Sequence, residues 1–275
     1  MTMASNTTML EQPLALAIFT RQFSAMIDAG FSLVRTIAVL ADSAPAPYDH
    51  AARRMFDAFE EYVRNEPPPS YDHSGRVVRP AAYDGPTLSG LMSERSGLFS
   101  AFYVKMVRVG EIGGVLEVTL RFLADLLDEA WGVARRSDHA ARVAWVLYPS
   151  HDVKLRDWAD LNSVQRCFVL ALFCKSLGTT LGAGVPRNFA FEVASDLLPD
   201  AQRDAVRALV HADADDADAV VAARDRRLGE ATEAFAFLPA LVMEMLAVGE
   251  ADGTLNLMME KAAYVYEHEL HCRLL

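Results

Sequence analysis

The sequence predicts an all-α protein made of two tandem homologous bundles of antiparallel helices, with about six helices in each bundle. Three observations predict this architecture. Apolar residues recur at spacings of three and four along most of the chain, as on one face of a helix. No convincing run alternates apolar and polar residues, so strands are not expected. Two groups of residues from the first half recur in the second half at constant offsets.

The repeat has two anchor points, one around Gly30 and Gly184 and the other around Gly110 and Gly249. At an offset of 154, the other matched residues are Phe19 and Phe173, Arg21 and Lys175, Phe23 and Leu177, Ile27 and Leu181, Ala29 and Ala183, and Phe31 and Val185. At an offset of 139, they are Met106 and Met245, Val109 and Val248, Glu111 and Glu250, Gly114 and Gly253, and Leu116 and Leu255. The difference of 15 residues predicts an insertion in the first copy.

The insertion is placed at residues 66–85. Pro67, Pro68, Pro69, Gly75 and Pro80 favour a loop there, because these residues interrupt regular structure. A docking segment for a partner is the alternative interpretation of the same proline-rich stretch.

The first copy is expected to span residues 13–136, after a disordered tail at residues 1–12. Gly30 ends its first helix, since glycine tolerates the left-handed turn after a helix. Pro45 and Pro47 close the second helix. The apolar faces, helix by helix, are Leu16, Phe19, Phe23, Met26 and Ile27; Leu33, Ile37 and Leu40; Met55, Phe59 and Val63; Leu88, Leu91 and Met92; Phe99, Phe102, Met106 and Val109; and Leu116, Leu120, Leu123, Leu127 and Trp131.

The second copy is expected to span residues 164–275, after a polar connector at residues 137–163. Its last helix repeats the longest stripe of the first copy. The residues of that stripe are Leu255, Met259, Ala262, Tyr266 and Leu270. A mean spacing near 3.6 predicts that this face is buried against other helices.

Composition narrows the classes of partner. The formal net charge of -11 opposes binding to phosphate backbones and to anionic lipid. Three cysteines at irregular spacing do not make a disulfide framework, which fits a reducing, cytoplasmic compartment. No uncharged run reaches the roughly 20 apolar residues that a membrane span needs, and residues 1–12 do not resemble a signal peptide.

The combined motifs resemble the type II secretion system F domain family, which includes inner-membrane platform proteins of type II secretion and type IV pilus systems. The resemblance is carried by a Phe-x-Arg/Lys helix ending in Ala-Gly and a Gly-Glu-x-x-Gly-x-Leu turn, both duplicated, and by a Gly-x-x-Leu-Ser turn in the first copy. Tyr148-Pro149 matches the start of the family's first membrane span, but Ser150, His151 and Asp152 follow. The resemblance therefore implies a relative without the usual transmembrane helices, or a shortened product.

By resemblance, the chain is a non-catalytic scaffold or adaptor that binds the assembly ATPase or other inner-membrane subunits of its machine. The family implies no catalytic residues and no cofactor, and it tends to dimerise. The expected location is cytoplasmic, or peripheral at the inner membrane through partners. A purely structural homodimer, or a pseudo-dimer of the two copies, is a third hypothesis.

The paired Gly110-Glu111 and Gly249-Glu250 turns are the most specific candidate site. A helix is expected to end at each glycine, with a new helix about four residues later. Each glutamate then lies beside the positive N-terminus of the following helix and accepts its N–H groups. The other reading is a contact or cation-binding role for Glu111 or Glu250, although no calcium loop is evident.

Three further motifs favour structural interpretations. Asp213, Asp215, Asp216 and Asp218 read as a solvated connection; the alternative is an all-helical Mg-dependent enzyme that uses this acidic run. His268, His271 and Cys272 read as a surface helix end rather than a metal site. Gly178, Gly182 and Gly184 lack the strand and the Gly-Lys-Ser/Thr of a phosphate loop, so helix packing explains them.

Overall fold

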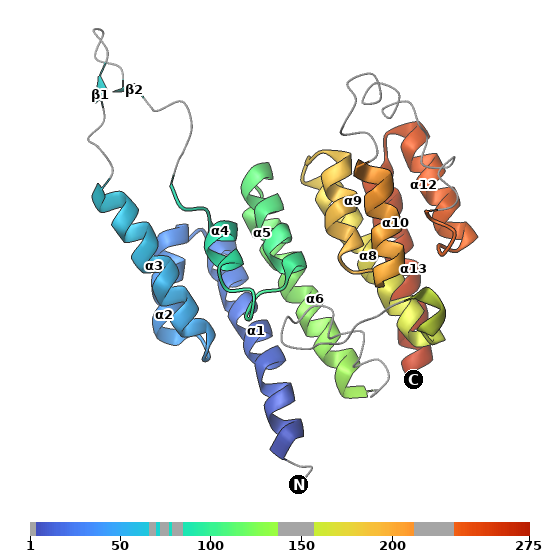
Figure 1. Cartoon of the computed structure of the whole chain (residues 1–275), viewed down its shortest axis with the longest axis horizontal. Coiled ribbons are helices and arrows are strands. Elements are labelled where there is room, and N and C mark those ends of the chain that lie inside the picture. The colour runs from blue at the N-terminus through green and yellow to red at the C-terminus, as the bar shows by residue number, and fades with distance from the viewer. Residues whose placement is uncertain (1–3, 66–69, 72–76, 79–84, 137–156, 212–233) are drawn as a thin grey trace.

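The computed structural model describes residues 4–65, 70–71, 77–78, 85–136, 157–211 and 234–275, and it confirms the all-helical class (Figure 1). In the first half the helices are α1 (Ala4–Asp28), α2 (Leu33–Ser43), α3 (Tyr48–Asn65), α4 (Leu88–Ser93), α5 (Ala101–Gly113) and α6 (Leu116–Arg136). In the second half they are the 3-10 helix η2 (Trp158–Asp160) and the α-helices α8 (Ser163–Gly182), α9 (Arg187–Ser195), α10 (Asp200–His211), α12 (Ala240–Asp252) and α13 (Leu255–Leu274).

Two expectations about local structure are corrected. Helix α1 begins at Ala4, so residues 4–12 are helical rather than a disordered tail. Alanine, methionine, leucine, glutamate and glutamine in this stretch all favour a helix. The insertion contains a two-residue antiparallel ladder of β1 (Ser70–Tyr71) and β2 (Val77–Val78), although no strand was expected. Tyrosine and valine favour such extended pairing.

The repeated glycines act in two different ways. Gly114 and Gly253 have φ angles of 66° and 68°, which places them just after α5 and α12 in the left-handed conformation. Gly110 and Gly249 instead lie within these helices, so the helix ends expected there are wrong. A Cβ on Gly110 would lie 2.9 Å from the Leu116 Cα, and one on Gly249 would lie 2.8 Å from the Leu255 Cα. Glycine is needed at both sites because the next helix passes so close.

The buried apolar side chains of both halves join in one continuous core. In the first half, α1 packs mainly on α6, and the Phe19 ring stacks on Tyr48 with ring centroids 5.3 Å apart. In the second half, α8 packs mainly on α13, and Phe173 makes an edge contact with Phe237. Phe19 and Phe173 are fully buried and occupy matching repeat positions. Burying a phenylalanine contributes about 1.5–3 kcal/mol, so the two sites anchor their respective helices.

The two halves contact each other through α5 and α6 of the first half and α9 and α8 of the second. Figure 1 shows α2 and α3 at one end of the molecule, α5 and α6 near its centre, and α12 at the other end. In the part of the chain that the structure describes, no helix is both long and apolar enough to span a membrane.

Candidate functional site

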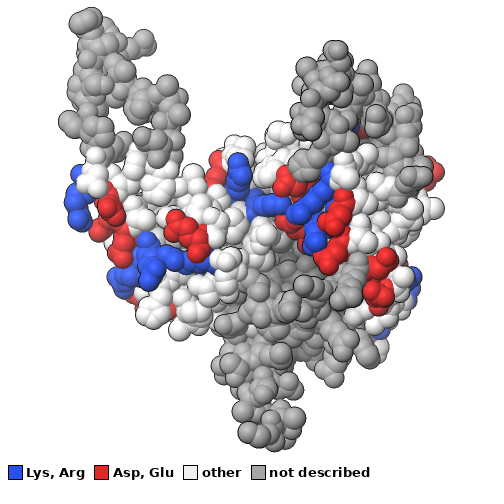
Figure 2. Space-filling model, viewed as in Figure 1, with Lys and Arg blue, Asp and Glu red and all other residues white. Residues whose placement is uncertain are grey.

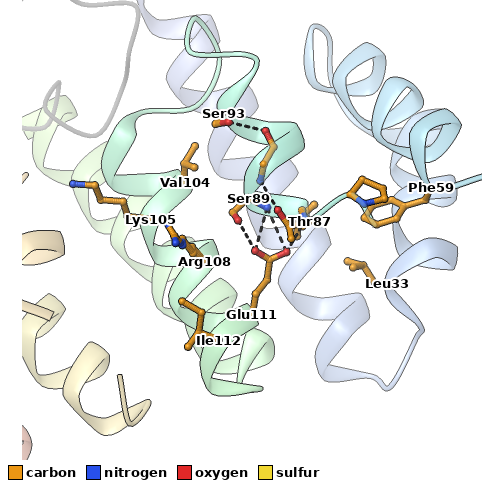
Figure 3. Close-up of a pocket in the computed structure, with 13 residues that line it drawn as sticks. Leu33, Phe59, Thr87, Ser89, Ser93, Val104, Lys105, Arg108, Glu111 and Ile112 are labelled. Atoms are coloured by element: carbon orange, nitrogen blue, oxygen red, sulfur yellow. Dashed lines mark hydrogen bonds between the residues drawn. The ribbon is translucent and has the colours of Figure 1, made fainter. Parts of the chain in front are cut away.

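A groove of about 760 Å³ lies beside Glu111, where α2, α3, α4 and α5 meet (Figure 3). Its walls combine apolar side chains with a few polar and charged ones. The apolar residues that Figure 3 labels are Leu33, Phe59, Val104 and Ile112, and the charged ones are Lys105, Arg108 and Glu111. Leu33 and Phe59 come from the opposite side of the groove to the α5 residues, so the fold of the first half brings the groove together.

The Glu111 carboxylate closes the N-terminus of α4. Its Oε1 accepts the Leu88 N–H at 2.6 Å, and its Oε2 accepts the Ser89 N–H at 3.3 Å and the Ser89 hydroxyl at 2.5 Å (Figure 3). The Thr87 side chain accepts the Gly90 N–H at 3.0 Å. Together these acceptors satisfy N–H groups that have no partner within the helix.

Glu111 therefore caps α4, whereas the helix expected from the sequence was the following one, α6. Side chains on a helix tilt toward its N-terminus. Glu111 lies in the last turn of α5, so its side chain points back along α5, away from the start of α6 at Leu116. It reaches α4, which precedes α5 in the chain but lies beside it in space.

The second copy has a smaller groove, of about 290 Å³, at the matching turn. Here Glu250 forms an ion pair with Arg187, with 2.6 Å between Oε1 and Nη1. Arg187 is the first residue of α9, and its repeat equivalent is Leu33, which lines the first groove. The repeat positions matching the start of α4 fall in residues 212–233, outside the described part of the chain.

The structure places the candidate metal ligands as follows. Glu111 and Glu250 line separate grooves, and each carboxylate faces hydrogen-bond donors rather than another carboxylate. The Cys272 Sγ lies 3.7 Å from the His268 Nε2. Among the described residues, no group of three or more histidine, cysteine, aspartate or glutamate side chains could hold a metal ion.

Of the two remaining sequence motifs, the structure describes the glycines of α8 but not the acidic run. Gly178 packs against α13, where an added Cβ would lie 3.0 Å from the Asn256 carbonyl oxygen, and Gly184 has a φ angle of 77° after α8. Both positions serve helix packing and termination, as expected. The acidic run at residues 213–218 lies outside the described residues, so the structure does not place it.

Sequence reasoning missed the ionic contacts between the halves. The Lys105 Nζ lies 2.9 Å from the Glu192 Oε1 and 3.1 Å from the Asp196 Oδ2, and the Arg108 guanidinium lies 5.7 Å from the Phe189 ring centroid. Residues 105, 108 and 112 share one face of α5 at helical spacing, which was the available signal. Sequence spacing does not reveal which distant helix covers that face.

A second ionic contact joins α6 to α8 and α13. The Lys175 Nζ lies 2.5 Å from the Glu267 Oε1 and 3.6 Å from the Glu129 Oε2. Burial lowers the pKa of Lys175, but hydrogen bonds and the charges of the two glutamates outweigh burial and raise it overall. Burial raises the pKa of Glu129, and Lys175 opposes that effect. The lysine thus stays charged and links both halves.

The all-helical first half, with its Gly-Glu turn capping a neighbouring helix, is similar to domains of bacterial secretion and pilus proteins. Residues 19–144 match the family described as "Type II secretion system (T2SS), protein F". The chain is 34% identical over 116 residues to the type II secretion system protein F of Xanthomonas campestris, and 29% identical over 107 residues to the type IV pilus assembly protein PilC of Myxococcus xanthus. These matches confirm the resemblance to the family.

The aligned segments cover 42% and 39% of this chain. They span 23% of the length of the Xanthomonas protein and 20% of that of the Myxococcus protein. The chain therefore matches about a quarter or less of each relative, and the family match lies within residues 19–144.

Proposed function

We propose that this chain is a non-catalytic scaffold of a type II secretion or type IV pilus machine and that it binds the assembly ATPase through the Glu111 groove. The observation that carries the proposal is the groove itself, within the segment that matches the secretion family. Its carboxylate is already engaged with α4, so it serves to shape the groove. On this proposal, residues 13–136 and 164–275 are two copies of one bundle, joined by residues 137–163.

The chemistry of the groove favours a protein segment as its occupant. Leu33, Val104 and Ile112 provide apolar surface, and Ile112 is exposed despite its size. Arg108 is also exposed and, among the described residues, its guanidinium contacts the Phe189 ring rather than a carboxylate. A partner segment that carries apolar side chains beside an acidic one would complement these walls.

The proposed location follows from the proposed partner. Binding to an assembly ATPase places the chain on the cytoplasmic side of the inner membrane, where it is held through other subunits. The magnesium-enzyme alternative depends on residues 213–218, and no described residue favours it.

The test is a titration of the full chain with the purified assembly ATPase of the same organism, followed by isothermal calorimetry. Ile112→Asp and Arg108→Glu each place unfavourable charge in the groove and should weaken binding about tenfold or more, which corresponds to about 1.4 kcal/mol. Arg54→Glu on α3 is the matched control, because Arg54 is exposed and does not line the groove. Absence of binding by the wild-type chain, or equal binding by all variants, would refute the proposal.

A further inference from the structure

Two cations of α5 line the Glu111 groove and also contact the second half of the chain. Lys105 and Arg108 lie three residues apart on α5, and both line the groove. Figure 3 shows Glu111 on the side of α5 that faces α4, whereas Lys105 points to the other side. There the two cations meet α9 and the residue just after it. Figure 2 shows basic and acidic side chains adjoining near the centre of the molecule.

The two cations differ in how far the second half satisfies their charge. The Lys105 Nζ lies 2.9 Å from the Glu192 Oε1 and 3.1 Å from the Asp196 Oδ2, so two carboxylates neutralise it. Among the described residues, Arg108 has no such carboxylate partner, and its guanidinium lies 5.7 Å from the Phe189 ring centroid. A carboxylate that enters the groove is therefore attracted to Arg108 rather than to Lys105.

The contact with Phe189 leaves Arg108 able to bind that carboxylate. An aromatic ring attracts a guanidinium through the face of the ring, whereas hydrogen bonds to a carboxylate use the N–H groups at the edge of the guanidinium plane. Phe189 is partly buried and packs against the core, which fixes its ring. Because the ring restricts the exposed Arg108 side chain, less conformational freedom remains to be lost when a carboxylate binds.

The internal repeat links the two cations to the second half. At the repeat positions of Lys105 and Arg108, α12 has Glu244 and Ala247. Helix α5 packs against α9, whereas α12 packs mainly on α13 and lies at an end of the molecule (Figure 1). The cations thus occur on the helix that meets α9 and not on its repeat equivalent. Pairing with carboxylates of α9 explains Lys105 but not Arg108.

We infer that Phe189 is a positioning residue for the Glu111 groove and that its ring holds Arg108 in place to bind an acidic side chain of the partner. The inference rests on the proposed binding of the ATPase in this groove and specifies one contact of that complex. A carboxylate of the ATPase accepts the Arg108 N–H groups, and Lys105 does not compete for it because Glu192 and Asp196 already neutralise its charge. The groove of the first half is therefore complete only with a residue of the second.

The experiment is isothermal calorimetry of the full chain with the purified assembly ATPase of the same organism. Phe189→Leu removes the ring but keeps an apolar side chain, and it should weaken binding about two- to fivefold, the scale of an exposed cation–π contact. Phe189→Tyr keeps the ring and should bind as the wild type does. Phe31→Leu is the matched control, because it removes the ring that lies 5.0 Å from the Arg35 guanidinium within the first half, and neither residue lines the groove.

A double-mutant cycle separates the positioning of Arg108 from a general effect on packing. On an Arg108→Ala background the ring has no guanidinium to hold, so Phe189→Leu should cause no further loss of affinity. A further loss of the same size would mean that Phe189 acts on the groove through packing alone, which overturns the inference. Phe189→Met also removes the ring and repeats the test with a second side chain, and far-ultraviolet circular dichroism checks that each variant folds.

The affinities of the wild type and of Phe189→Leu distinguish this inference from the proposed function. If the wild-type chain does not bind the ATPase, the proposed function is refuted and the inference with it. If the wild type binds and Phe189→Leu binds equally well, the proposed function stands and only the inference is overturned. Tighter binding by Phe189→Leu would mean that the ring competes with the partner for Arg108, which also overturns the inference.

Discussion

Glu111 fixes one wall of the groove through its hydrogen bonds to α4. Its carboxylate accepts hydrogen bonds from two backbone N–H groups of α4 and from the Ser89 hydroxyl. Helix α4 has only six residues, and so short a helix is marginal without an external partner for its first N–H groups. Glu111 therefore fixes the position of α4 and, with it, one wall of the groove.

The variant Glu111→Ala tests this capping role, because it leaves the first N–H groups of α4 without the carboxylate that accepts them. We expect the free energy of unfolding to fall by about 1–2 kcal/mol, the usual cost of losing a capping side chain. Urea denaturation followed by circular dichroism measures the change. Glu61→Ala on the exposed face of α3 is the control and should have little effect. Equal stability of the Glu111 and Glu61 variants would contradict the capping role.

The sequence predicted the chemistry of Glu111 but not its partner. A glutamate beside a Gly-x-x-Gly turn suggested a helix N-terminus nearby, and its carboxylate does accept N–H groups. The capped helix is α4 rather than α6. Because α5 continues to Gly113, Glu111 still lies within α5, and its side chain tilts back along that helix toward α4. Residue spacing indicates which helices are consecutive in the chain, whereas contacts between α4 and α5 arise only from the packing of the whole bundle.

At the scale of elements, apolar periodicity was a reliable guide to the helices and a weaker guide to their ends. The stripes expected on α1, α6 and α13 are largely buried, including Phe19, Leu123 and Met259. The ends of α5 and α12 were placed at Gly110 and Gly249, yet each helix continues for three more residues. From the sequence alone, either Gly110 or Gly114 could end α5, and either Gly249 or Gly253 could end α12. Only the close approach of the next helix to Gly110 and Gly249 distinguishes the two positions.

Gly110→Ala tests whether that close approach requires glycine. A Cβ at this position would lie 2.2 Å from the Thr119 Oγ1 and 2.9 Å from the Leu116 Cα, so α5 and α6 must separate to admit it. We expect a loss of about 1–3 kcal/mol in the free energy of unfolding, despite the better helix propensity of alanine. Thermal and urea denaturation measure the loss.

Gly97→Ala is the matched control for that variant, since no atom lies within 4 Å of the added Cβ and the backbone does not have a positive φ angle. This substitution should be neutral or slightly stabilising, because alanine restricts the unfolded chain. If both variants had the same stability, the tight contact between α5 and α6 would not be the reason for glycine at position 110.

At the scale of the whole molecule, a continuous core and two ionic contacts join the halves. Lys105 of α5 faces Glu192 of α9 and Asp196, the residue just after α9, and the Asp196 side chain is largely buried. Lys175 of α8 faces Glu129 of α6. A partly buried charge pair adds little net stability when intact but is costly to break, because the remaining charge is left without its partner. The halves are therefore expected to unfold together.

Lys105→Glu tests this coupling by placing a third negative charge beside Glu192 and Asp196. The contact between the halves should weaken by about 2 kcal/mol or more, since repulsion replaces attraction at a partly buried site. Differential scanning calorimetry should show one transition for the wild type and two for the variant, because each half keeps its own buried aromatic anchor, Phe19 or Phe173. Arg54→Glu makes the same charge change on the exposed face of α3 and should preserve the single transition. Two transitions in the wild type would mean that the halves are independent, and a single unshifted transition in the variant would mean that Lys105 does not couple them.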